Sequence, residues 1–160
     1  MVIKNIIIED FANYKKPSMF IGFPYCSFKC EKDCGEKCCQ NSSLAQSENI
    51  EISVEEIIKT YEEHNIPKGI VCGGLEPFDS WEDLLELIKQ FRSKFNDDIV
   101  IYTGYKEAEI ADKVRTLCAF PPVIIKFGRF IPHQENHYDE ILGVNLASPN
   151  QYARRLNDEI

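Results

Sequence analysis

No apolar run in the sequence approaches the roughly 20 residues needed to cross a bilayer. Its first residues hold only a short apolar stretch, and the acidic pair Glu9 and Asp10 follows at once, which is not typical of a signal peptide. We therefore expect a cytoplasmic protein with no membrane partner.

The sequence also lacks an excess of basic side chains. Among 160 residues there are 18 Lys and Arg against 26 Asp and Glu, which gives a formal net charge of −8. Neutralising phosphates needs clustered basic residues, so this balance disfavours a nucleic-acid partner or an anionic membrane surface. Repeats, linkers and low-complexity stretches are absent as well. The length predicts one domain over residues 1–160.

Cysteine, by contrast, is concentrated in one segment. Five of the 7 cysteines fall at positions 26, 30, 34, 38 and 39, whereas Cys72 and Cys118 are isolated and are predicted to be buried small hydrophobes. The odd total is unlike a secreted disulfide scaffold. In a cytosolic protein such a cluster is more typical of metal binding, and an iron–sulfur cluster needs thiolates that converge from a short loop.

Hydrophobic periodicity predicts strands that alternate with helices. The helices are expected at Ser53–His64, Trp81–Phe95 and Lys106–Leu117, and the strands at Ser18–Phe23, Gly69–Cys72, Ile99–Thr103 and Val123–Lys126, with a further edge strand at Val2–Ile8. Ser53 followed by Glu56 is a capping box. Asp79 or Ser80 is a candidate cap for the second helix, and Asp79, Glu82 and Asp83 are interpreted as its solvated first turn. This order predicts an α/β fold with a compact parallel sheet and helical crossovers.

Functional groups of a parallel α/β sheet gather at the carboxyl ends of its strands. The cysteine-rich loop follows the first predicted strand, Gly73-Gly74-Leu75-Glu76-Pro77 follows the second, and Thr103-Gly104-Tyr105 ends the third. Three unusual loops at one edge of the sheet predict that the site lies there.

The segment Cys26-Ser-Phe-Lys-Cys30 resembles the first half of the radical S-adenosylmethionine (SAM) signature, in which three residues separate the first two cysteines and two separate the next pair. Further segments resemble the activating proteins of anaerobic ribonucleotide reductase in the same order along nearly the whole chain. These are Cys39-Gln-Asn41, Gly73-Gly74-Leu75-Glu76-Pro77, Tyr102-Thr-Gly-Tyr105, Phe127-Gly-Arg-Phe130 and Ala147-Ser-Pro-Asn-Gln151.

This resemblance implies an incomplete (βα) barrel that carries a [4Fe-4S] cluster on three cysteines and leaves one iron for SAM. The activity it implies is reductive cleavage of SAM to a 5′-deoxyadenosyl radical, which then takes a hydrogen from a glycine of a partner enzyme. A flavodoxin or ferredoxin would supply the electron. The cofactor-binding residues it implies are Tyr25, Gly73, Gly74, Glu76 and Thr103, with Glu76 on the SAM amino group.

The cysteine spacing departs from the signature, because the expected third cysteine position is occupied by Asp33. We favour Cys26, Cys30 and Cys39 as ligands, since Asn41 repeats the family's context after the third cysteine and loops tolerate insertions. Cys34 and Cys38 remain alternatives for the third ligand.

Two other interpretations stay open. One is a radical SAM enzyme that acts on a small molecule, as the carboxy-deazaguanine synthases do. The other is a non-catalytic zinc module with Cys30, Cys34, Cys38 and Cys39 as tetrahedral ligands.

Overall fold

The computed structural model describes residues 1–27, 32, 35 and 42–156. Within them, a six-stranded sheet runs in the order β10-β7-β6-β5-β3-β2. Its central strands are parallel and comprise β3 (Ser18–Phe23), β5 (Gly69–Gly74), β6 (Asp98–Tyr102) and β7 (Val123–Phe127). Both edges are antiparallel, formed by β2 (Asn5–Asp10) and β10 (Tyr152–Arg155).

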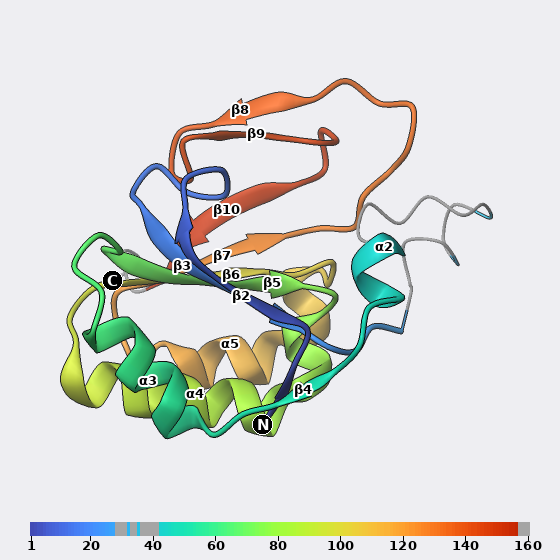
Figure 1. Ribbon diagram of the computed structural model, residues 1–160. Coiled ribbons are helices and arrows are strands. Elements are labelled where there is room, and N and C mark those ends of the chain that lie inside the picture. Colours follow the sequence, from blue (N-terminus) through green and yellow to red (C-terminus); the bar gives the residue numbers. More distant parts are fainter. Residues whose placement is uncertain (28–31, 33–34, 36–41, 157–160) are drawn as a thin grey trace.

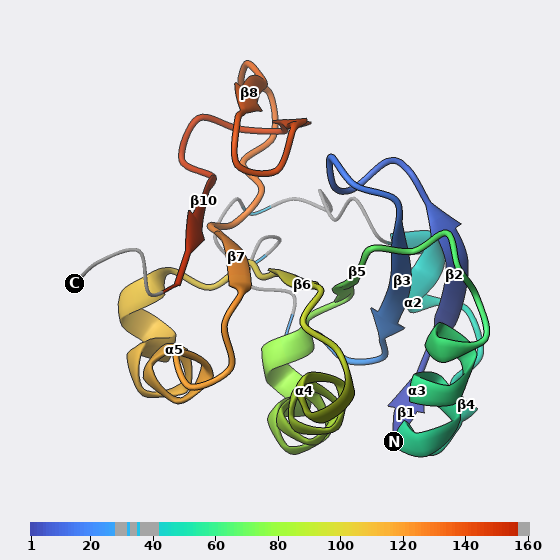
Figure 2. The same ribbon diagram turned by 90° about the vertical axis from the view of Figure 1, so that its left-hand side faces the viewer.

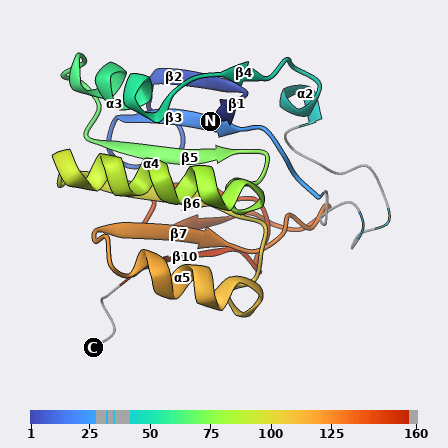
Figure 3. The same ribbon diagram turned by 90° about the horizontal axis from the view of Figure 1, so that it is seen from below.

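Helices cover one face of this sheet, as Figures 1 and 2 show for α3 (Val54–Glu62), α4 (Trp81–Lys94) and α5 (Ala111–Leu117). Figure 3, seen from this side, shows α4 and α5 along the sheet, with the arrowheads of the parallel strands β5 and β7 pointing the same way. Short 3₁₀ turns, η1 (Pro77–Ser80) and η2 (Glu107–Ile110), lead into α4 and α5. A four-residue helix, α2 (Ser42–Ala45), and the pair β1 (Val2–Ile3) with β4 (Ile50–Glu51) lie before α3.

The main core lies between the helices and the sheet, because alternate strand residues point to the helical face. On β5 these are Ile70 and Cys72, and on α4 the apolar stripe Leu84, Leu87, Ile88 and Phe91 is fully buried against them. Burial of each such side chain contributes about 1.5–3 kcal/mol. Cys72 is thus a core residue, as the sequence predicted, whereas Cys118 is only partly buried and that part of the prediction is corrected.

The other face of the sheet carries a hairpin of β8 (His137–Asp139) and β9 (Val144–Leu146), drawn above β10 in Figure 1. A second, smaller core joins Leu142 and Leu146 of this region to Val71 and Val100 of the sheet. The connection between β2 and β3 packs beside the hairpin, since the Lys15 side chain lies against Gly143. Both segments are therefore fixed over the helix-free face.

The α/β class and the strands at Ser18–Phe23 and after Gly69 are confirmed. Ser53 caps α3 as predicted and accepts a hydrogen bond from the Glu56 amide. The expectation of a purely parallel sheet is corrected at both edges, where β2 and β10 run antiparallel. The hairpin and β10 were not predicted, because strands of three or four residues are too short to show a clear period.

Within the described ranges, none of the helices is long and apolar enough to cross a membrane.

Candidate functional site

The chain leaves β3 at Phe23 and reaches the cysteine-rich loop through Tyr25, Cys26 and Ser27. The Cys26 thiol is half-buried, and Tyr25 is 50% exposed. Of the five clustered cysteines, Cys30, Cys34, Cys38 and Cys39 lie outside the described residues. Cys30 and Cys39 as cluster ligands, and the rival zinc set, therefore stay predictions. In the described part of the chain, no three His, Cys, Asp or Glu side chains form a group that could hold a metal ion.

The loop after β5 holds the segment that enters Cys26. The Leu75 amide donates to the Phe23 carbonyl at 3.2 Å, and the Glu76 amide donates to the Tyr25 carbonyl at 2.8 Å. These bonds continue the pairing of β3 with β5 beyond the ends of both strands. The backbone on both sides of Cys26 is thereby tied to the glycine-containing loop that the sequence predicted to lie beside it.

Gly74 brings these two segments into close contact. Its φ of +83° lies in the left-handed region, and a Cβ there would sit 2.8 Å from the Gly22 Cα and 2.9 Å from the Phe23 nitrogen. A side chain would therefore force β5 away from β3. At Gly74 the structure thus shows a close contact between two strands. The predicted approach of this backbone to a ligand stays a prediction.

Glu76 is buried, with 5% of its surface exposed. Its Oε1 accepts hydrogen bonds from the Thr103 hydroxyl at 2.7 Å and the Phe78 amide at 3.2 Å, and its Oε2 accepts from the Gly104 amide at 2.9 Å. Burial raises the pKa of Glu76 to about 7, against the opposing effect of these bonds and with a contribution from nearby Asp79. The carboxylate thus joins the loops after β5 and β6, and its contact with SAM stays a prediction.

Thr103 extends this network to the loop after β7. It is buried, its Oγ accepts from the Tyr105 amide at 3.0 Å, and its own amide donates to the Lys126 carbonyl at 2.9 Å. The Gly128 amide in turn donates to the Tyr105 carbonyl at 3.1 Å. The carboxyl ends of all four parallel strands are therefore linked by hydrogen bonds.

Asp79 is a residue whose role the sequence did not reveal. Its Oδ2 accepts from the Ser27 amide at 3.0 Å, and its Oδ1 accepts from the Tyr105 hydroxyl at 2.5 Å. Burial is the main reason that the pKa of Tyr105 is raised to about 12, and the hydrogen bond to Asp79 is the next. The interpretation of Asp79 as part of a solvated first turn is wrong, because its side chain points back to the cysteine-rich loop. Ser80 takes the N-cap position of α4 without a side-chain capping bond.

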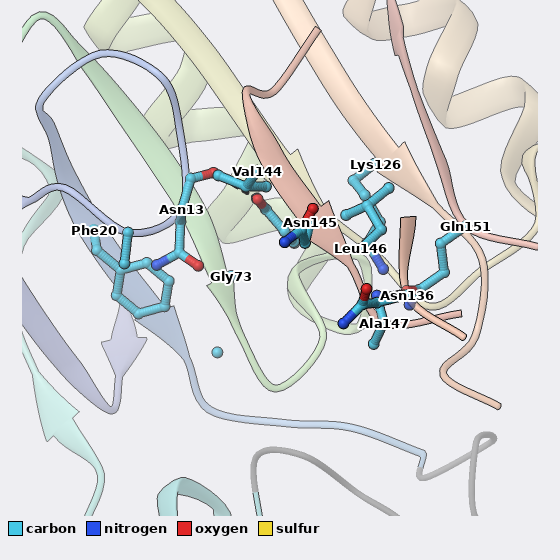
Figure 4. A pocket seen from close by; sticks show the side chains of 13 residues that line it. Asn13, Phe20, Gly73, Lys126, Asn136, Val144, Asn145, Leu146, Ala147 and Gln151 are labelled. Carbon is cyan, nitrogen blue, oxygen red and sulfur yellow. Dashed lines mark hydrogen bonds between the residues drawn. The ribbon is translucent and has the colours of Figure 1, made fainter. Parts of the chain in front are cut away.

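A cavity of ≈ 450 Å³ lies on the helix-free face at the same end of the sheet (Figure 4). Its floor includes Phe20, Gly73, Tyr102 and Lys126, which come from four neighbouring strands. Its walls come from the β2–β3 connection and from the segment around β8 and β9, and Gly74 lines it too. The volume falls within the roughly 300–1,000 Å³ typical of small-molecule sites.

The cavity is polar and contains one buried cation. Lys126 is 7% exposed, its Nζ donates to the Gly128 carbonyl at 3.1 Å, and the same Nζ lies 5.8 Å from the centre of the Tyr102 ring. The Tyr102 hydroxyl donates to the Asn13 carbonyl at 2.5 Å, and burial raises the Tyr102 pKa. Side-chain amides of Asn13, Asn136 and Asn145 complete the polar lining.

An ammonium group buried among amides suits an anionic group such as a carboxylate. Of the predicted cofactor-binding residues, Gly73 and Gly74 line this cavity, whereas Tyr25, Glu76 and Thr103 are not among its lining residues. The sequence did not point to the rest of the lining, because Lys126 was only the last residue of a predicted strand and the β8–β9 segment was not predicted. The polar cavity and Cys26, at the start of the cysteine-rich loop, therefore lie at the same end of the sheet.

A family model described as a 4Fe-4S single cluster domain matches residues 18–150. The match begins at the first residue of β3 and includes the cysteine-rich loop and the residues that line the cavity from Phe20 to Ala147. No curated protein matches the sequence. Several soft thiolates in one loop are the donor set that such a cluster requires, and Cys26 is held at the start of that loop.

Proposed function

The chain belongs to the family of 4Fe-4S single cluster domains, and on that premise we propose that it is a radical SAM enzyme whose cluster is held by Cys26, Cys30 and Cys39. When bound, the cluster supplies the electron that cleaves SAM to a 5′-deoxyadenosyl radical. The protein's own part is to bind SAM, orient it and exclude water.

The observation that carries this proposal is the contact of the cavity with the segment that enters Cys26. Gly74 lines the cavity and also packs against Gly22 and Phe23, three residues before that cysteine. A ligand in the cavity therefore lies beside the strand that delivers the first thiolate. Such closeness is what a cofactor that must touch both the cluster and the protein requires.

The chemistry of the cavity suits SAM. Its carboxylate would be paired with the Lys126 ammonium, which belongs to a buried side chain, and such a charge-assisted bond is stronger than a neutral one. Adenine offers a donor and an acceptor side by side, which a side-chain amide such as that of Asn136 or Asn145 can match. The same residues would position SAM without taking part in its cleavage.

We propose further that the substrate is a glycine of a partner protein, such as anaerobic ribonucleotide reductase, and that the fold is an incomplete barrel of the radical SAM type. The order of the motifs from Cys26-Ser-Phe-Lys-Cys30 to Ala147-Ser-Pro-Asn-Gln151 supports this assignment. So do four parallel strands with helices on one face only, because the other face is then available to SAM. A flavodoxin or ferredoxin is the proposed reductant.

A radical SAM enzyme for a small molecule is the second candidate. One observation favours it: the β8–β9 segment forms a wall of the cavity and so restricts what can enter. Mass spectrometry separates the two candidates, since deuterium from a labelled glycine of the partner would appear in 5′-deoxyadenosine only if the partner is the substrate. Label that appears only with a small-molecule substrate would favour the second candidate.

The proposed function is tested by anaerobic reconstitution with iron and sulfide, followed by reduction and addition of SAM. We expect about four irons per chain, as for one [4Fe-4S] cluster, and formation of 5′-deoxyadenosine that depends on the reductant. A colourless protein with one tightly bound zinc and no SAM cleavage would contradict the proposal and favour the zinc module.

A further inference from the structure

Asp79 contacts the cysteine-rich loop one residue beyond Cys26. Its Oδ2 accepts the Ser27 amide at 3.0 Å, while its Oδ1 accepts the Tyr105 hydroxyl at 2.5 Å. The two carboxylate oxygens thus bridge the cluster loop after β3 and the loop after β6. Asp79 itself lies in η1, after the loop that holds the Tyr25 carbonyl.

These contacts fix the backbone on both sides of Cys26. The Tyr25 carbonyl is held by the Glu76 amide on one side, and the Ser27 amide is held by Asp79 on the other. A residue whose neighbours are both anchored has few directions left for its side chain. The Glu76 anchor uses only backbone atoms, whereas the second anchor depends on a single carboxylate.

We propose that Asp79 is a positioning residue for Cys26: backed by Tyr105, it fixes the Ser27 amide and so sets the direction of the Cys26 thiolate toward the cluster. This inference rests on the proposed role of Cys26 as a ligand, but not on SAM cleavage. Replacing a group that holds a metal ligand in place commonly lowers metal affinity or activity by about 10–100-fold.

The charge of Asp79 should also affect the reduction potential of the cluster. A negative group close to an iron–sulfur cluster disfavours the reduced, more negative state, because net charge is one of the factors that set the reduction potential. Position and charge can be separated by substitution. Asp79→Ala removes both, whereas Asp79→Asn removes the charge and keeps a carbonyl oxygen for the Ser27 amide and an NH₂ group for the Tyr105 oxygen.

The test uses the full chain, reconstituted with iron and sulfide, in four variants: Asp79→Ala, Asp79→Asn, Tyr105→Phe and, as a control, Glu82→Ala. Glu82 is an exposed acid three residues further along, in the first turn of α4. The measurements are the rate of iron release to a chelator, the EPR spectrum of the reduced cluster, its midpoint potential, and the melting temperature of each metal-free protein.

We expect Asp79→Ala to release iron about tenfold faster than the unmodified protein, which is the change that loss of a hydrogen bond to a charged group produces. Tyr105→Phe should cause a smaller increase, because the Ser27 bond remains. Asp79→Asn should release iron at close to the original rate and shift the midpoint potential upward. Glu82→Ala should change neither the rate of iron release nor the midpoint potential.

Two results would overturn the proposal. One is an unchanged release rate in Asp79→Ala. The other is an Asp79→Asn variant that releases iron as fast as Asp79→Ala, with an equal fall in the melting temperature of the metal-free forms of these two variants. The carboxylate would then only stabilise the fold. If Asp79→Ala does not fold, the potential of Asp79→Asn and the release rate of Tyr105→Phe decide the question.

Iron retention is measured without SAM, so the two proposals fail separately. Absence of SAM cleavage with the expected order of release rates would contradict the proposed function and leave this inference standing. SAM cleavage with unchanged iron release in Asp79→Ala would contradict this inference and leave the proposed function standing.

Discussion

Two charged side chains at the strand ends, Glu76 and Lys126, differ in their contacts and in their position relative to the cavity. The Glu76 carboxylate accepts three hydrogen bonds from its own chain, so its first effect is to hold the loops after β5 and β6 together. Lys126, although buried, lines the cavity with an ammonium group. Lys126 is therefore the group that we propose pairs with the carboxylate of SAM.

The buried Glu76 predicts a pH-dependent stability. Burial raises its pKa from an ordinary value of 4.5 to about 7. Between these values the unfolded chain has lost the proton and the folded chain keeps it, so unfolding releases a proton and becomes easier as pH rises. The contribution of Glu76 to stability should therefore fall through this window, by on the order of 3 kcal/mol in total.

Glu76→Gln tests this prediction, because glutamine resembles the protonated acid and does not titrate. Denaturant unfolding of the metal-free proteins should show the stability of the unmodified protein, relative to Glu76→Gln, falling from pH 4.5 to about 7 and levelling off above it. A difference that stays constant over this range would show that Glu76 titrates normally. Glu82→Gln, at an exposed acid, is the control.

The third cluster ligand is also decided at the scale of single residues. We expect Cys39→Ala to reduce the iron content well below four per chain after reconstitution, because a cluster with two protein thiolates is not retained. Cys34→Ala should keep the full content, and Cys118→Ala, at the end of α5, is the control. Loss of iron in Cys34→Ala with retention in Cys39→Ala would identify the alternative ligand set.

At the scale of elements, the parallel strands form the floor of the cavity and the hairpin forms part of its wall. The register aligns Gly22, Gly73, Tyr102 and Lys126 across four strands, so these positions lie in one row on the helix-free face. The hairpin of β8 and β9 then walls the cavity that this floor leaves open. Its position depends on the tight contact of Gly143 with Lys15.

Gly143→Ala should displace the hairpin and destabilise the protein. Gly143 has a φ of +73°, and an added Cβ would lie 2.6 Å from the Lys15 Cβ, so conformational strain and a clash act together. We expect a loss of about 1–3 kcal/mol in chemical denaturation. Gly35→Ala is a matched control, since its φ is +74° but none of the described atoms lies within 4 Å of the added Cβ. Equal losses at the two positions would show that the contact with Lys15 has no effect.

At the scale of the whole molecule, the two faces of the sheet differ: one stabilises the fold, and the cavity lies on the other. The helical face holds the larger apolar core, whereas the opposite face carries a smaller core and the polar cavity. All four parallel strands end at one side of the sheet, where the cavity and Cys26 lie, because parallel strands share one direction. A cofactor bound there would contact residues far apart in the sequence.

Lys126→Met should therefore weaken SAM binding without loss of the cluster. Methionine keeps the apolar stem of the lysine but removes the ammonium, and loss of a charge-assisted bond in a buried site predicts roughly a tenfold or larger increase in Kd. Equilibrium dialysis of labelled SAM against the reconstituted protein measures this change, and the iron content checks the cluster. Lys89→Met, at an exposed position on α4, is the control. An unchanged Kd would exclude Lys126 from the SAM site.

The sequence by itself determined the α/β class, the helices α3 and α4, the strands of the sheet centre and the loops at their carboxyl ends. These features follow from local periodicity, capping residues such as Ser53, and the shared direction of parallel strands. The cysteine density likewise indicated an iron–sulfur family, which the family match confirms.

Only the tertiary structure decided the antiparallel edges, the hairpin over the sheet, and the contacts of Asp79, Glu76 and Lys126. Each depends on contacts between residues distant in sequence, such as the Asp79 carboxylate with the Ser27 amide, 52 positions apart. A local pattern shows that Asp79 stands near a helix start, but not that its side chain turns back to another loop. That choice is made by packing of the strand ends, because the sheet brings the loops after β3, β5 and β6 side by side.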